Sequence, residues 1–371
     1  MRGVAVLGST GSVGRSTLAV LARQRDHFRL VALTAGCKRA ELEAQAAEWA
    51  PDFVGLAEPQ SDARYPTGPE VLIEAALHPD VDIVVNAVVG VAGLDATLAA
   101  LRAGKRVALA SKETLVMAGE LVAEAAKAGG GELVPVDSEH SAVLQCIAGH
   151  PAAVDRLILT GSGGPFRDWA PERVAAATVS EALNHPTWRM GKKITVDSAT
   201  LANKALEVIE AHHLFGLPYD ALEVVIHPQS MVHALVEFCD GSVIAQLAFP
   251  SMELPILYGL THPGRLPDPG VRRFDPVAAG PLTFEPVRTE VFRAFGAGVA
   301  AGRAGGTAPA VFNAANEAAV AAFLEGCIPF GMISELIERV LETHRREPVT
   351  DVETVRAADR WARRRAHELL R

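Results

Sequence analysis

Two carboxylates stand one residue apart in Asp137-Ser138-Glu139, directly after the predicted buried strand Leu133 to Val136. In an extended segment the side chains of residues i and i+2 project to the same side. This spacing brings both carboxylates to one point at the carboxyl edge of a sheet, where ligands bind in open α/β folds. Hard oxygen ligands suit Mg²⁺ or Mn²⁺ when a third ligand comes from elsewhere. The alternative is a helix N-cap with Glu139 in the first turn, which the residue types themselves favour.

A glycine-rich turn follows the first predicted strand, Val4 to Leu7, and opens a helix. Gly8, Gly11 and Gly14 permit backbone N–H groups and a helix N-terminus to hold a pyrophosphate. Their spacing is G-x-x-G-x-x-G and not the usual G-x-G-x-x-G, so a plain tight turn is the alternative. The position at the start of the chain favours a dinucleotide cofactor.

The end of the second predicted strand, Leu30 to Leu33, bears on which dinucleotide binds. An NAD site needs an acidic residue there for the ribose hydroxyls, whereas this chain has Lys38 and Arg39 shortly after Gly36. Two cations at this point suit the 2′-phosphate of NADPH. The alternative is that they begin a solvated helix.

A second glycine-rich turn, Thr160 to Phe166, follows the predicted strand Leu157 to Leu159. It offers hydroxyl and N–H groups suited to an anionic substrate, with a simple loop as the alternative. Farther on, Asp197-Ser198 is predicted to cap a helix that runs through His213. Three polar residues share one face of that helix, namely Asn203, Lys204 and Glu207. Lys204 and Glu207 alone would usually be a surface ion pair.

The segment His185 to Lys193 carries Trp188 and a methionine without helical or strand periodicity, and Pro and Gly bound it. Such a stretch is typical of a lid that closes over substrate. His227 follows another predicted strand. A lone histidine in that position is more often a structural group than a catalyst.

The hydrophobic pattern predicts the elements that position these residues. Up to about Asp137, short β-branched runs alternate with alanine-rich helical stretches, which indicates βαβ units around a parallel sheet. The runs Val232 to Cys239 and Ser242 to Phe249 flank Asp240-Gly241, a two-residue hairpin signal that requires antiparallel pairing. The hairpin therefore belongs to a second domain.

The last third of the chain begins with a stretch from about Thr261 to Pro286 that is rich in Pro, Gly and Arg. It lacks periodicity and is predicted to be a surface linker. The chain then turns helical. Thr350-Asp351-Val352-Glu353 predicts a capping box before the final helix, on which Val355, Ala358, Trp361, Ala362 and Leu369 form one apolar stripe.

Composition excludes several function classes. The chain has 371 residues and a formal net charge of −9, the wrong sign for a protein whose main partner is DNA, RNA or an anionic membrane. The first apolar run is only as long as a strand, so neither a signal peptide nor a membrane span is expected. The four cysteines lie far apart without a Cys-x-x-Cys pair. This spacing suggests neither a disulfide framework nor a thiolate zinc site, and a reducing cytoplasm fits best.

Taken together, the motifs resemble the 1-deoxy-D-xylulose 5-phosphate reductoisomerase family over nearly the whole chain. The segments that carry the resemblance are Gly8 to Gly14, Ser111-Lys112-Glu113, Asp137 to His140, Thr160 to Phe166, His185 to Met190, Asp197 to Glu207, His227 to Ser230 and Asn313-Ala314-Ala315-Asn316-Glu317. The resemblance implies an NADPH-dependent enzyme that rearranges 1-deoxy-D-xylulose 5-phosphate and reduces the product to 2-C-methyl-D-erythritol 4-phosphate in non-mevalonate isoprenoid synthesis.

The resemblance also assigns roles to single residues. It makes Asp137, Glu139 and Glu207 the ligands of Mg²⁺ or Mn²⁺, with Co²⁺ as a further ion, and Ser162, Ser198, Asn203 and Lys204 the phosphate pocket. Lys112 and Ser138 would contact the reacting end of the substrate, with His185, Trp188 and His227 also in the catalytic and substrate set. The residues expected around NADPH are Thr10, Gly11, Ser12, Val13, Gly36, Lys38, Ser111, Glu113 and Gly191. Ser111 departs from the family, because many members have Asn there.

The expected α/β architecture has three domains and one linker. A Rossmann-type NADPH-binding domain spans residues 1–137, an α+β catalytic domain spans 138–262, a linker spans 263–286, and a helical domain spans 287–371. The resemblance further implies a small phosphorylated substrate, a homodimer and a cytoplasmic location.

Two rival functions make different demands on the sequence. A semialdehyde-type dehydrogenase would need a nucleophilic cysteine, and Cys146 lies in an apolar, helix-like run. A non-catalytic NADPH-sensing or scaffold protein would need no separated carboxylates and no lid.

Overall fold

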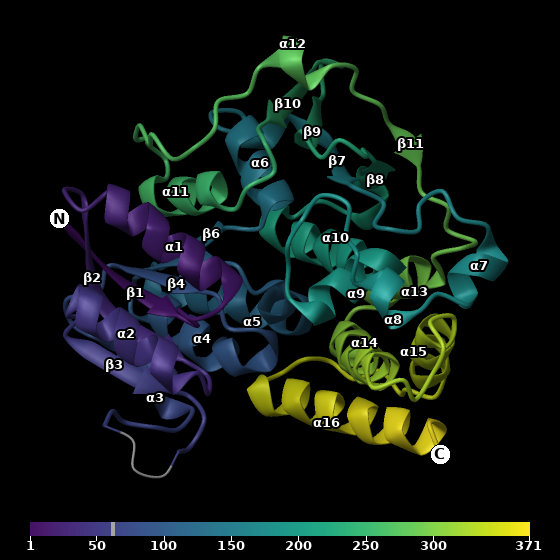
Figure 1. Cartoon of the computed structure of the whole chain (residues 1–371), viewed down its shortest axis with the longest axis horizontal. Helices are drawn as coiled ribbons and strands as arrows, with labels where there is room; N and C mark the ends of the chain where they lie inside the picture. Colours follow the sequence, from purple (N-terminus) through teal and green to yellow (C-terminus); the bar gives the residue numbers. More distant parts are fainter. Residues whose placement is uncertain (61–63) are drawn as a thin grey trace. The chain divides into compact units, whose positions relative to one another are not determined.

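The computed structural model describes residues 1–60 and 64–371, and the chain divides into two compact units. Unit 1 comprises Met1–Thr114, Glu120–Leu144 and Ser251–Arg273. Unit 2 comprises Leu115–Gly119, Gln145–Pro250 and Phe274–Arg371. Figure 1 labels the helices and strands of both. None of the helices in the described ranges is long and apolar enough to cross a membrane.

Unit 1 is built on a six-stranded parallel sheet with the strand order β3-β2-β1-β4-β5-β6. The strands are β1 (Arg2–Leu7), β2 (Phe28–Ala35), β3 (Phe53–Leu56), β4 (Ile83–Asn86), β5 (Arg106–Leu109) and β6 (Glu132–Pro135). Their residues are mostly buried, because helices on both faces shield a parallel sheet from water. This order confirms the predicted Rossmann-type sheet. The pattern did not single out β3, which has only four residues and contains a glycine.

The helices associated with unit 1 connect these strands or return to them later. They are α1 (Ser12–Arg23), α2 (Arg39–Trp49), α3 (Glu70–Leu77), α4 (Leu94–Arg102, after the 3₁₀ turn η1, Gly90–Gly93), α5 (Lys112–Gly129), α6 (Ser138–Cys146) and α11 (Glu253–Thr261). Residues 115–119 of α5 and 145–146 of α6 group with unit 2.

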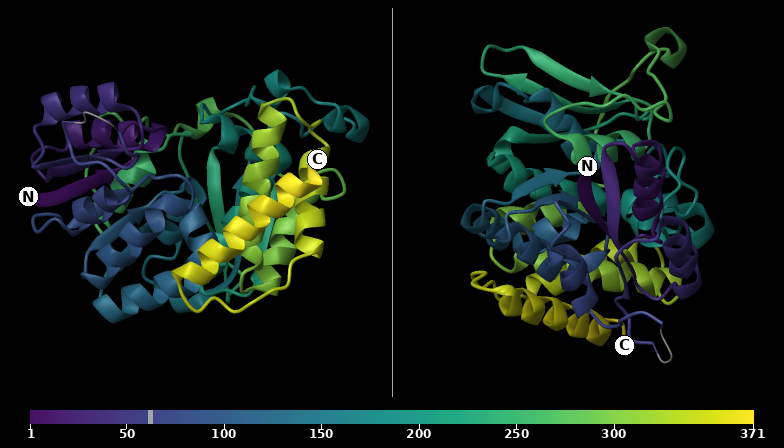
Figure 2. Two further views of the ribbon diagram at one scale, coloured as in Figure 1. Left: turned by 90° about the horizontal axis from the view of Figure 1, so that it is seen from below. Right: turned by 90° about the vertical axis from the view of Figure 1, so that its left-hand side faces the viewer.

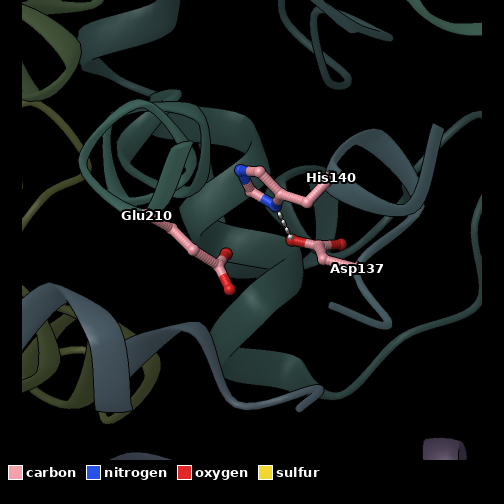
Figure 3. Close-up of side chains that lie close together, drawn as sticks. All are labelled: Asp137, His140 and Glu210. Carbon is pink, nitrogen blue, oxygen red and sulfur yellow. Dashed lines mark ion pairs between the residues drawn. The ribbon is translucent and has the colours of Figure 1, made fainter. Parts of the chain in front are cut away.

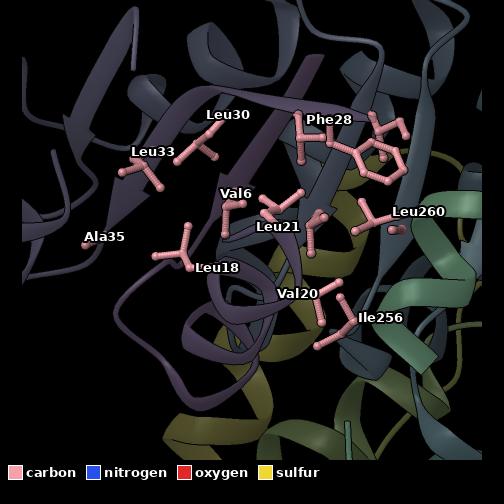
Figure 4. Close-up of a cluster of buried hydrophobic side chains, with 14 of the residues drawn as sticks. Val6, Leu18, Val20, Leu21, Phe28, Leu30, Leu33, Ala35, Ile256 and Leu260 are labelled. Atoms are coloured by element: carbon pink, nitrogen blue, oxygen red, sulfur yellow. The ribbon is translucent and has the colours of Figure 1, made fainter. Parts of the chain in front are cut away.

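One face of the parallel sheet packs against α1 and α11. Figure 4 shows Leu18 and Leu21 of α1 beside Val6 of β1, with Ile256 and Leu260 of α11 completing the cluster. Burying each such side chain contributes about 1.5–3 kcal/mol. A helix that begins at residue 253 therefore belongs to the core of the N-terminal sheet, which local sequence pattern did not predict.

Unit 2 contains a five-stranded mixed sheet with the order β10-β9-β7-β8-β11. The strands are β7 (Val154–Gly161), β8 (Leu222–Ile226), β9 (Val232–Phe238), β10 (Val243–Leu247) and β11 (Glu285–Pro286). The pair β9 and β10 is antiparallel, which confirms the predicted hairpin, whereas β7 and β8 are parallel. Between these last two strands the chain forms the helices that carry most of the candidate phosphate site.

The helices of unit 2 fall into those that precede β11 in the chain and a C-terminal group that follows it. The first comprises α7 (Pro171–Ala175), α8 (Val179–Ala182), α9 (Lys192–Thr200), α10 (Ala202–Phe215) and α12 (Pro276–Ala279), with the 3₁₀ turns η2 (Pro151–Ala153) and η3 (Tyr219–Ala221). The second comprises α13 (Arg293–Ala304), α14 (Ala308–Leu324), α15 (Met332–Glu342) and α16 (Val352–Leu369). Figure 2 shows α16, in yellow, crossing its neighbours α14 and α15.

The start of α16 differs from the predicted capping box. Asp351 is the N-cap, because its carboxylate accepts a hydrogen bond of 2.7 Å from the Thr354 backbone N–H. Thr350 lies one residue too early for that role. The predicted apolar stripe is confirmed in part, with Val355, Ala358 and Ala362 buried. The stretch predicted as a linker is irregular from His262 to Phe284 except for α12, and it ends in β11, which pairs with β8.

Candidate active site

Four of the predicted site segments follow the ends of strands in the unit 1 sheet. Gly8 follows β1, Gly36 follows β2, Ser111 comes shortly after β5, and Asp137 comes shortly after β6. Because parallel strands end at the same edge, this edge collects the predicted cofactor residues together with Lys112, Asp137 and Glu139. The topology thus supports a nucleotide site at the carboxyl edge.

The glycines of the first turn have different physical roles. Gly8 has φ +82°, and a Cβ on Gly14 would lie 2.3 Å from the Gly8 carbonyl oxygen. These two positions exclude a side chain for reasons of packing. At Gly11 the only atom near an added Cβ is the Gly8 oxygen at 3.3 Å, and Gly11 is the N-cap of α1. The N-terminus of α1 is therefore left without side-chain capping, as an anion site requires.

Gln45 of α2 holds this turn in place through two hydrogen bonds to Ser9. The Ser9 hydroxyl donates to Gln45 Oε1 at 2.7 Å, and Gln45 Nε2 donates to the Ser9 carbonyl at 3.2 Å. The sequence analysis missed Gln45, because a glutamine in a helix gives no signal of its own. Thr10 beside Ser9 is 5% exposed, while Gly11 and Ser12 are exposed.

The two cations after β2 belong to the start of α2. Lys38 is its N-cap residue and lies 3.1 Å from Glu41, while Arg39 lies 2.8 Å from Glu43. The alternative interpretation, in which Lys38 and Arg39 begin a solvated helix, is therefore correct for the backbone. Exposed ion pairs of this kind contribute only about 0–1 kcal/mol, so the same cations can exchange Glu for a phosphate at little cost.

The carboxylate pair after β6 has a different backbone from the one expected. α6 begins at Ser138, and the Ser141 N–H donates to the Asp137 carbonyl at 2.8 Å. The argument from an extended i, i+2 spacing is therefore wrong, and the helix-start alternative is correct. A helix start is favoured over an extended segment here because the Asp137 carboxylate accepts the Ser138 N–H at 3.0 Å, which satisfies a donor at the helix end.

Asp137 also lies among charged partners. Its Oδ2 is 2.6 Å from Lys112 Nζ and 3.8 Å from His140 Nδ1, the contact drawn in Figure 3. The Ser138 hydroxyl donates to Glu139 Oε2 at 2.6 Å. Lys112 is only 5% exposed, so its ammonium group is held at the sheet edge and not in solvent. The structure thus brings together Lys112, Asp137, Ser138 and Glu139, as the sequence analysis expected.

In unit 2, three predicted residues meet around one imidazole nitrogen. His185 Nε2 lies 3.1 Å from the Ser162 hydroxyl and 3.1 Å from the Ser198 hydroxyl, and the Gly164 N–H donates to Ser162 Oγ at 3.2 Å. The two serines come from the turn after β7 and from α9. Hydroxyl and N–H donors converging from separate elements form a suitable cradle for an anion.

The contacts of His185 fix its tautomer. The backbone N–H groups of Thr187 and Trp188 both donate to Nδ1, at 3.1 and 2.9 Å. Nδ1 is therefore an acceptor, and in the neutral ring the proton is on Nε2, which donates to one of the two serine hydroxyls. Burial lowers the pKa of His185 to about 4, because desolvation disfavours the imidazolium. His185 is thus neutral at pH 7.

Lys204 and Glu207 lie 4% and 1% exposed on α10, so the interpretation as a surface pair is wrong. Lys204 Nζ forms an ion pair with Glu207 Oε2 and donates to the Thr160 carbonyl at 2.5 Å. Asn203 Nδ2 donates to Glu207 Oε1. All three predicted residues of this helix face therefore belong to one buried polar cluster beside the turn after β7.

Two predicted boundaries near this cluster are wrong. Asp197 and Ser198 do not cap α10, because both lie inside α9, and α10 begins only after Leu201, which has φ +58°. The predicted lid ends earlier than Lys193, since α9 begins at Lys192 with Gly191 as its N-cap. From His185 to Gly191 the backbone has no helix or strand, as expected of a lid.

His227 has both ring nitrogens engaged. Nδ1 lies 2.8 Å from the Thr283 carbonyl, and the Met231 N–H donates to Nε2 at 3.1 Å. Burial lowers the pKa of His227, partly offset by the bond to Thr283. The ring also stacks on Phe284 with centroids 4.8 Å apart. These contacts describe a structural histidine, the role that the sequence analysis gave as more usual.

Comparison with known proteins agrees with this geometry. A family model for 1-deoxy-D-xylulose 5-phosphate reductoisomerase matches residues 4–119, and models for C-terminal domains of the same enzyme match residues 133–215 and 247–365. The reductoisomerase of Geobacillus kaustophilus is 49% identical, with 100% of each chain covered. The chain belongs to the 1-deoxy-D-xylulose 5-phosphate reductoisomerase family.

Other members of the family are also similar to this chain over its whole length. The reductoisomerase of Citrifermentans bemidjiense is 50% identical, with 100% of this chain and 99% of the relative covered. The solved reductoisomerase of Zymomonas mobilis in complex with NADPH is 40% identical, with a TM-score of 0.92 and coverage of 100% and 99%. A reductoisomerase solved with NADPH, fosmidomycin and magnesium is 39% identical, with the same TM-score and coverage of 100% and 98%.

Family membership argues against the semialdehyde-dehydrogenase alternative, and the structure supplies a physical reason as well. Cys146 is 8% exposed at the end of α6. A nucleophilic cysteine needs access to its substrate and a base to activate it. This chain instead presents the polar clusters around Lys112 and Lys204.

Proposed function

We propose that this chain catalyses the NADPH- and divalent-metal-dependent rearrangement and reduction of 1-deoxy-D-xylulose 5-phosphate to 2-C-methyl-D-erythritol 4-phosphate, a step of non-mevalonate isoprenoid synthesis. The observation that carries the proposal is the match across the whole chain to reductoisomerases about half identical to it. The solved relatives with NADPH and magnesium support both cofactors.

For NADPH, the proposal places the pyrophosphate at the turn from Thr10 to Val13, with Gly36 near the adenosine end and Ser111, Glu113 and Gly191 as further contacts. The geometry of the turn supports this, because Gly14 packs against Gly8 while an added Cβ at Gly11 meets no atom closer than 3.3 Å. Lys38 is the proposed partner of the 2′-phosphate.

For the divalent ion, the proposed ligands are Asp137, Glu139 and Glu207. The donor chemistry fits, since three carboxylates provide hard oxygen ligands of the kind that Mg²⁺ and Mn²⁺ prefer. Asp137 and Glu207 are each already the ion-pair partner of a lysine, Lys112 and Lys204 respectively. Both carboxylates therefore lie where the protein accommodates a cation.

The substrate phosphate is proposed to bind Ser162, Ser198, Asn203 and Lys204. When bound, the ion polarises the carbonyl and hydroxyl oxygens of the substrate and NADPH supplies the hydride. The chain's own residues orient the reactants. Lys112 and Ser138 hold the carbonyl and hydroxyl end, the phosphate pocket anchors the other end, and this remote binding energy aligns the reacting carbons. His185, neutral at pH 7, donates from Nε2 into the same pocket.

The segment His185 to Gly191 is proposed to close over bound substrate and exclude water, with Trp188 as its covering side chain. His227 is proposed to lie near the reacting carbons as part of the catalytic set, with its ring held in place by the backbone groups that engage both ring nitrogens. Protease protection of the lid that increases with a phosphonate ligand is the expected result. Identical protection with and without that ligand would contradict closure.

The decisive test follows NADPH absorbance at 340 nm with 1-deoxy-D-xylulose 5-phosphate, with and without Mg²⁺ or Mn²⁺. Oxidation that needs both the substrate and the metal, with 2-C-methyl-D-erythritol 4-phosphate as the product, supports the proposal. Binding of NADPH without turnover under all metal conditions would instead favour the non-catalytic alternative.

Three further expectations belong to the same proposal. The chain forms a homodimer, which scattering in solution tests, and it acts in the cytoplasm, which fractionation of the source cells tests. The domain division at residues 137, 262 and 286 stays a prediction. Limited proteolysis checks it, with the first cuts expected between residues 263 and 286.

A further inference from the structure

A buried amide on the C-terminal helices is bonded to a buried carboxylate beside the proposed phosphate pocket. Asn316 of α14 is 0% exposed, and its Nδ2 donates to Asp197 Oδ1 at 2.8 Å. Asp197 of α9 is 1% exposed. Its other oxygen, Oδ2, lies 2.9 Å from Lys193 Nζ, one turn earlier in α9. Both oxygens of the Asp197 carboxylate are thus engaged, one by Asn316 of α14 and the other by Lys193 of the same helix.

The contact extends into α16. Lys193 Nζ also lies 4.0 Å from Glu317 Oε1, and Glu317 Oε2 lies 2.5 Å from the Arg363 guanidinium. Arg363 in turn is 2.8 Å from Asp359. The side chains of three helices, α9, α14 and α16, therefore form one continuous polar network. Asn316 and Glu317 belong to the motif Asn313-Ala314-Ala315-Asn316-Glu317, to which the proposed reaction gives no role.

The helix fixed by this network carries a residue of the proposed pocket. Ser198 directly follows Asp197, and on a helix the two side chains point about 100° apart, so Asp197 reaches α14 while Ser198 reaches His185. The N-cap of α9 is Gly191, where the proposed lid ends. Movement of α9 would therefore shift both Ser198 and the base of the lid.

Little free space would absorb such a movement. A Cβ at Gly164, in the turn after β7, would lie 2.7 Å from the Ser198 carbonyl oxygen, so backbone from the two elements is already in close contact. A buried carboxylate is costly unless it is fully paired, and an apolar pair of similar volume is often as stable. Stability alone therefore does not explain why a charge is buried here.

We propose that Asn316 and Asp197 are positioning residues, which hold α9 so that Ser198 lies where it can bind the substrate phosphate. The inference rests on the proposed function and adds to it a residue from the C-terminal helices. Asn316 does not touch the substrate in this proposal. It acts through Asp197, and the effect is specific to the phosphate end of the substrate.

The test replaces Asn316 by Ala in the full-length protein and measures three quantities with Mg²⁺ present. These are KM and kcat for 1-deoxy-D-xylulose 5-phosphate, the calorimetric Kd of the phosphonate fosmidomycin, and the Kd of NADPH. A hydrogen bond to a charged group corresponds to about one to two powers of ten in an equilibrium constant. We expect KM and the phosphonate Kd to rise about tenfold, with kcat within about threefold and the NADPH Kd unchanged.

Val355→Ala is the matched control, because Val355 is fully buried in α16 and is not part of the network. It should lower Tm as Asn316→Ala does, without changing the phosphonate Kd. The exchange variant Asp197→Asn/Asn316→Asp restores a donor and an acceptor across the contact, and it should recover part of the lost affinity.

Three outcomes would overturn the inference. These are an unchanged phosphonate Kd in Asn316→Ala, an equal loss in Val355→Ala, and an exchange variant no better than the single Asn316→Ala variant. If Asn316→Ala does not fold, the exchange variant alone decides, and it should bind the phosphonate within about tenfold of the unsubstituted protein. Failure of the proposed function is distinguishable, because the unsubstituted protein would then neither turn over the substrate nor bind the phosphonate.

Discussion

The carboxyl edge of the unit 1 sheet and the polar cluster of unit 2 are built by different physical means. At the sheet edge, backbone groups and glycines form the site, and of the two cations there Lys38 is exposed and Arg39 is half-buried. In unit 2, side chains form the site, and Lys204 and Glu207 are almost completely buried. A site made of backbone depends on where strands end, whereas a site made of buried side chains depends on what surrounds them.

The difference predicts unequal tolerance to substitution. A buried ion pair that loses one partner leaves an uncompensated charge, which costs about 3–5 kcal/mol. An exposed pair costs at most about 1 kcal/mol. Substitutions in unit 2 should therefore affect catalysis and folding together, and substitutions at the exposed end of the nucleotide site should affect cofactor choice alone.

The largest effect is expected for Glu207→Gln, which keeps size and helix propensity but removes the charge. Turnover should fall by about 10²–10³-fold, since an electrostatic contact to developing charge is lost. NADPH binding should survive, and Tm should fall because Lys204 loses its partner. Steady-state kinetics, metal titration and thermal unfolding check this. Glu223→Gln, at an exposed position of β8, is the control. Near-normal turnover and metal affinity in Glu207→Gln would refute the metal assignment.

Gly14→Ala should be the most damaging change at the nucleotide turn. The new methyl group would lie 2.3 Å from the Gly8 carbonyl oxygen, so the start of α1 must shift. We expect NADPH affinity to fall on the order of 100-fold, because the pyrophosphate site is made of this backbone. Fluorescence titration of NADPH measures it. Gly296→Ala in α13, where an added Cβ meets no atom within 4 Å, should bind NADPH normally.

Lys38→Ala tests the exposed end of the same site. Removal of a charge-assisted contact should weaken NADPH binding about tenfold and leave NADH binding unchanged. Comparing kcat/KM for NADPH with kcat/KM for NADH measures this change in preference. Arg29→Ala, which removes an exposed cation elsewhere on β2, should alter neither value. If Lys38→Ala also leaves both unchanged, Arg39 is the next residue to test.

The smallest expected effect is a pH dependence of the His185 contacts. The pKa of this histidine is lowered to about 4 in the folded protein from an ordinary value of 6.5. Its contribution to stability is therefore present above about pH 6.5 and is lost as the pH falls toward 4. Hydrogen exchange of residues 185–191, expressed relative to the intrinsic exchange rate at each pH, should therefore quicken as the pH falls across that interval. In His185→Gln the rates should depend on pH only through the intrinsic chemistry of exchange, and the same quickening there would exclude His185 as the cause.

Local sequence signals were reliable where a backbone event sets the structure. Gly8 and Gly14 mark a turn between strand and helix because few other residues fit the backbone there, and Asp240-Gly241 marks a hairpin for a similar reason. The position of the two carboxylates after β6 was predicted correctly. Their backbone was predicted to be extended, but it starts a helix, and these two possibilities look alike over three residues. Resemblance to a known family, and not spacing, supplied Glu207 as a partner for them.

The sequence by itself determined the alternation of strands and helices in unit 1, the nucleotide turn, the β9–β10 hairpin and the residue types of each polar cluster. These follow from periodicity and from the steric demands of glycine, which act over a few residues. Only the tertiary structure decided that α11 completes the core of the N-terminal sheet and that Lys204 and Glu207 are buried. It also decided that Asn316 bonds Asp197 across 119 positions of the chain. Burial and partnership depend on which distant segments pack together, and no local pattern carries that information.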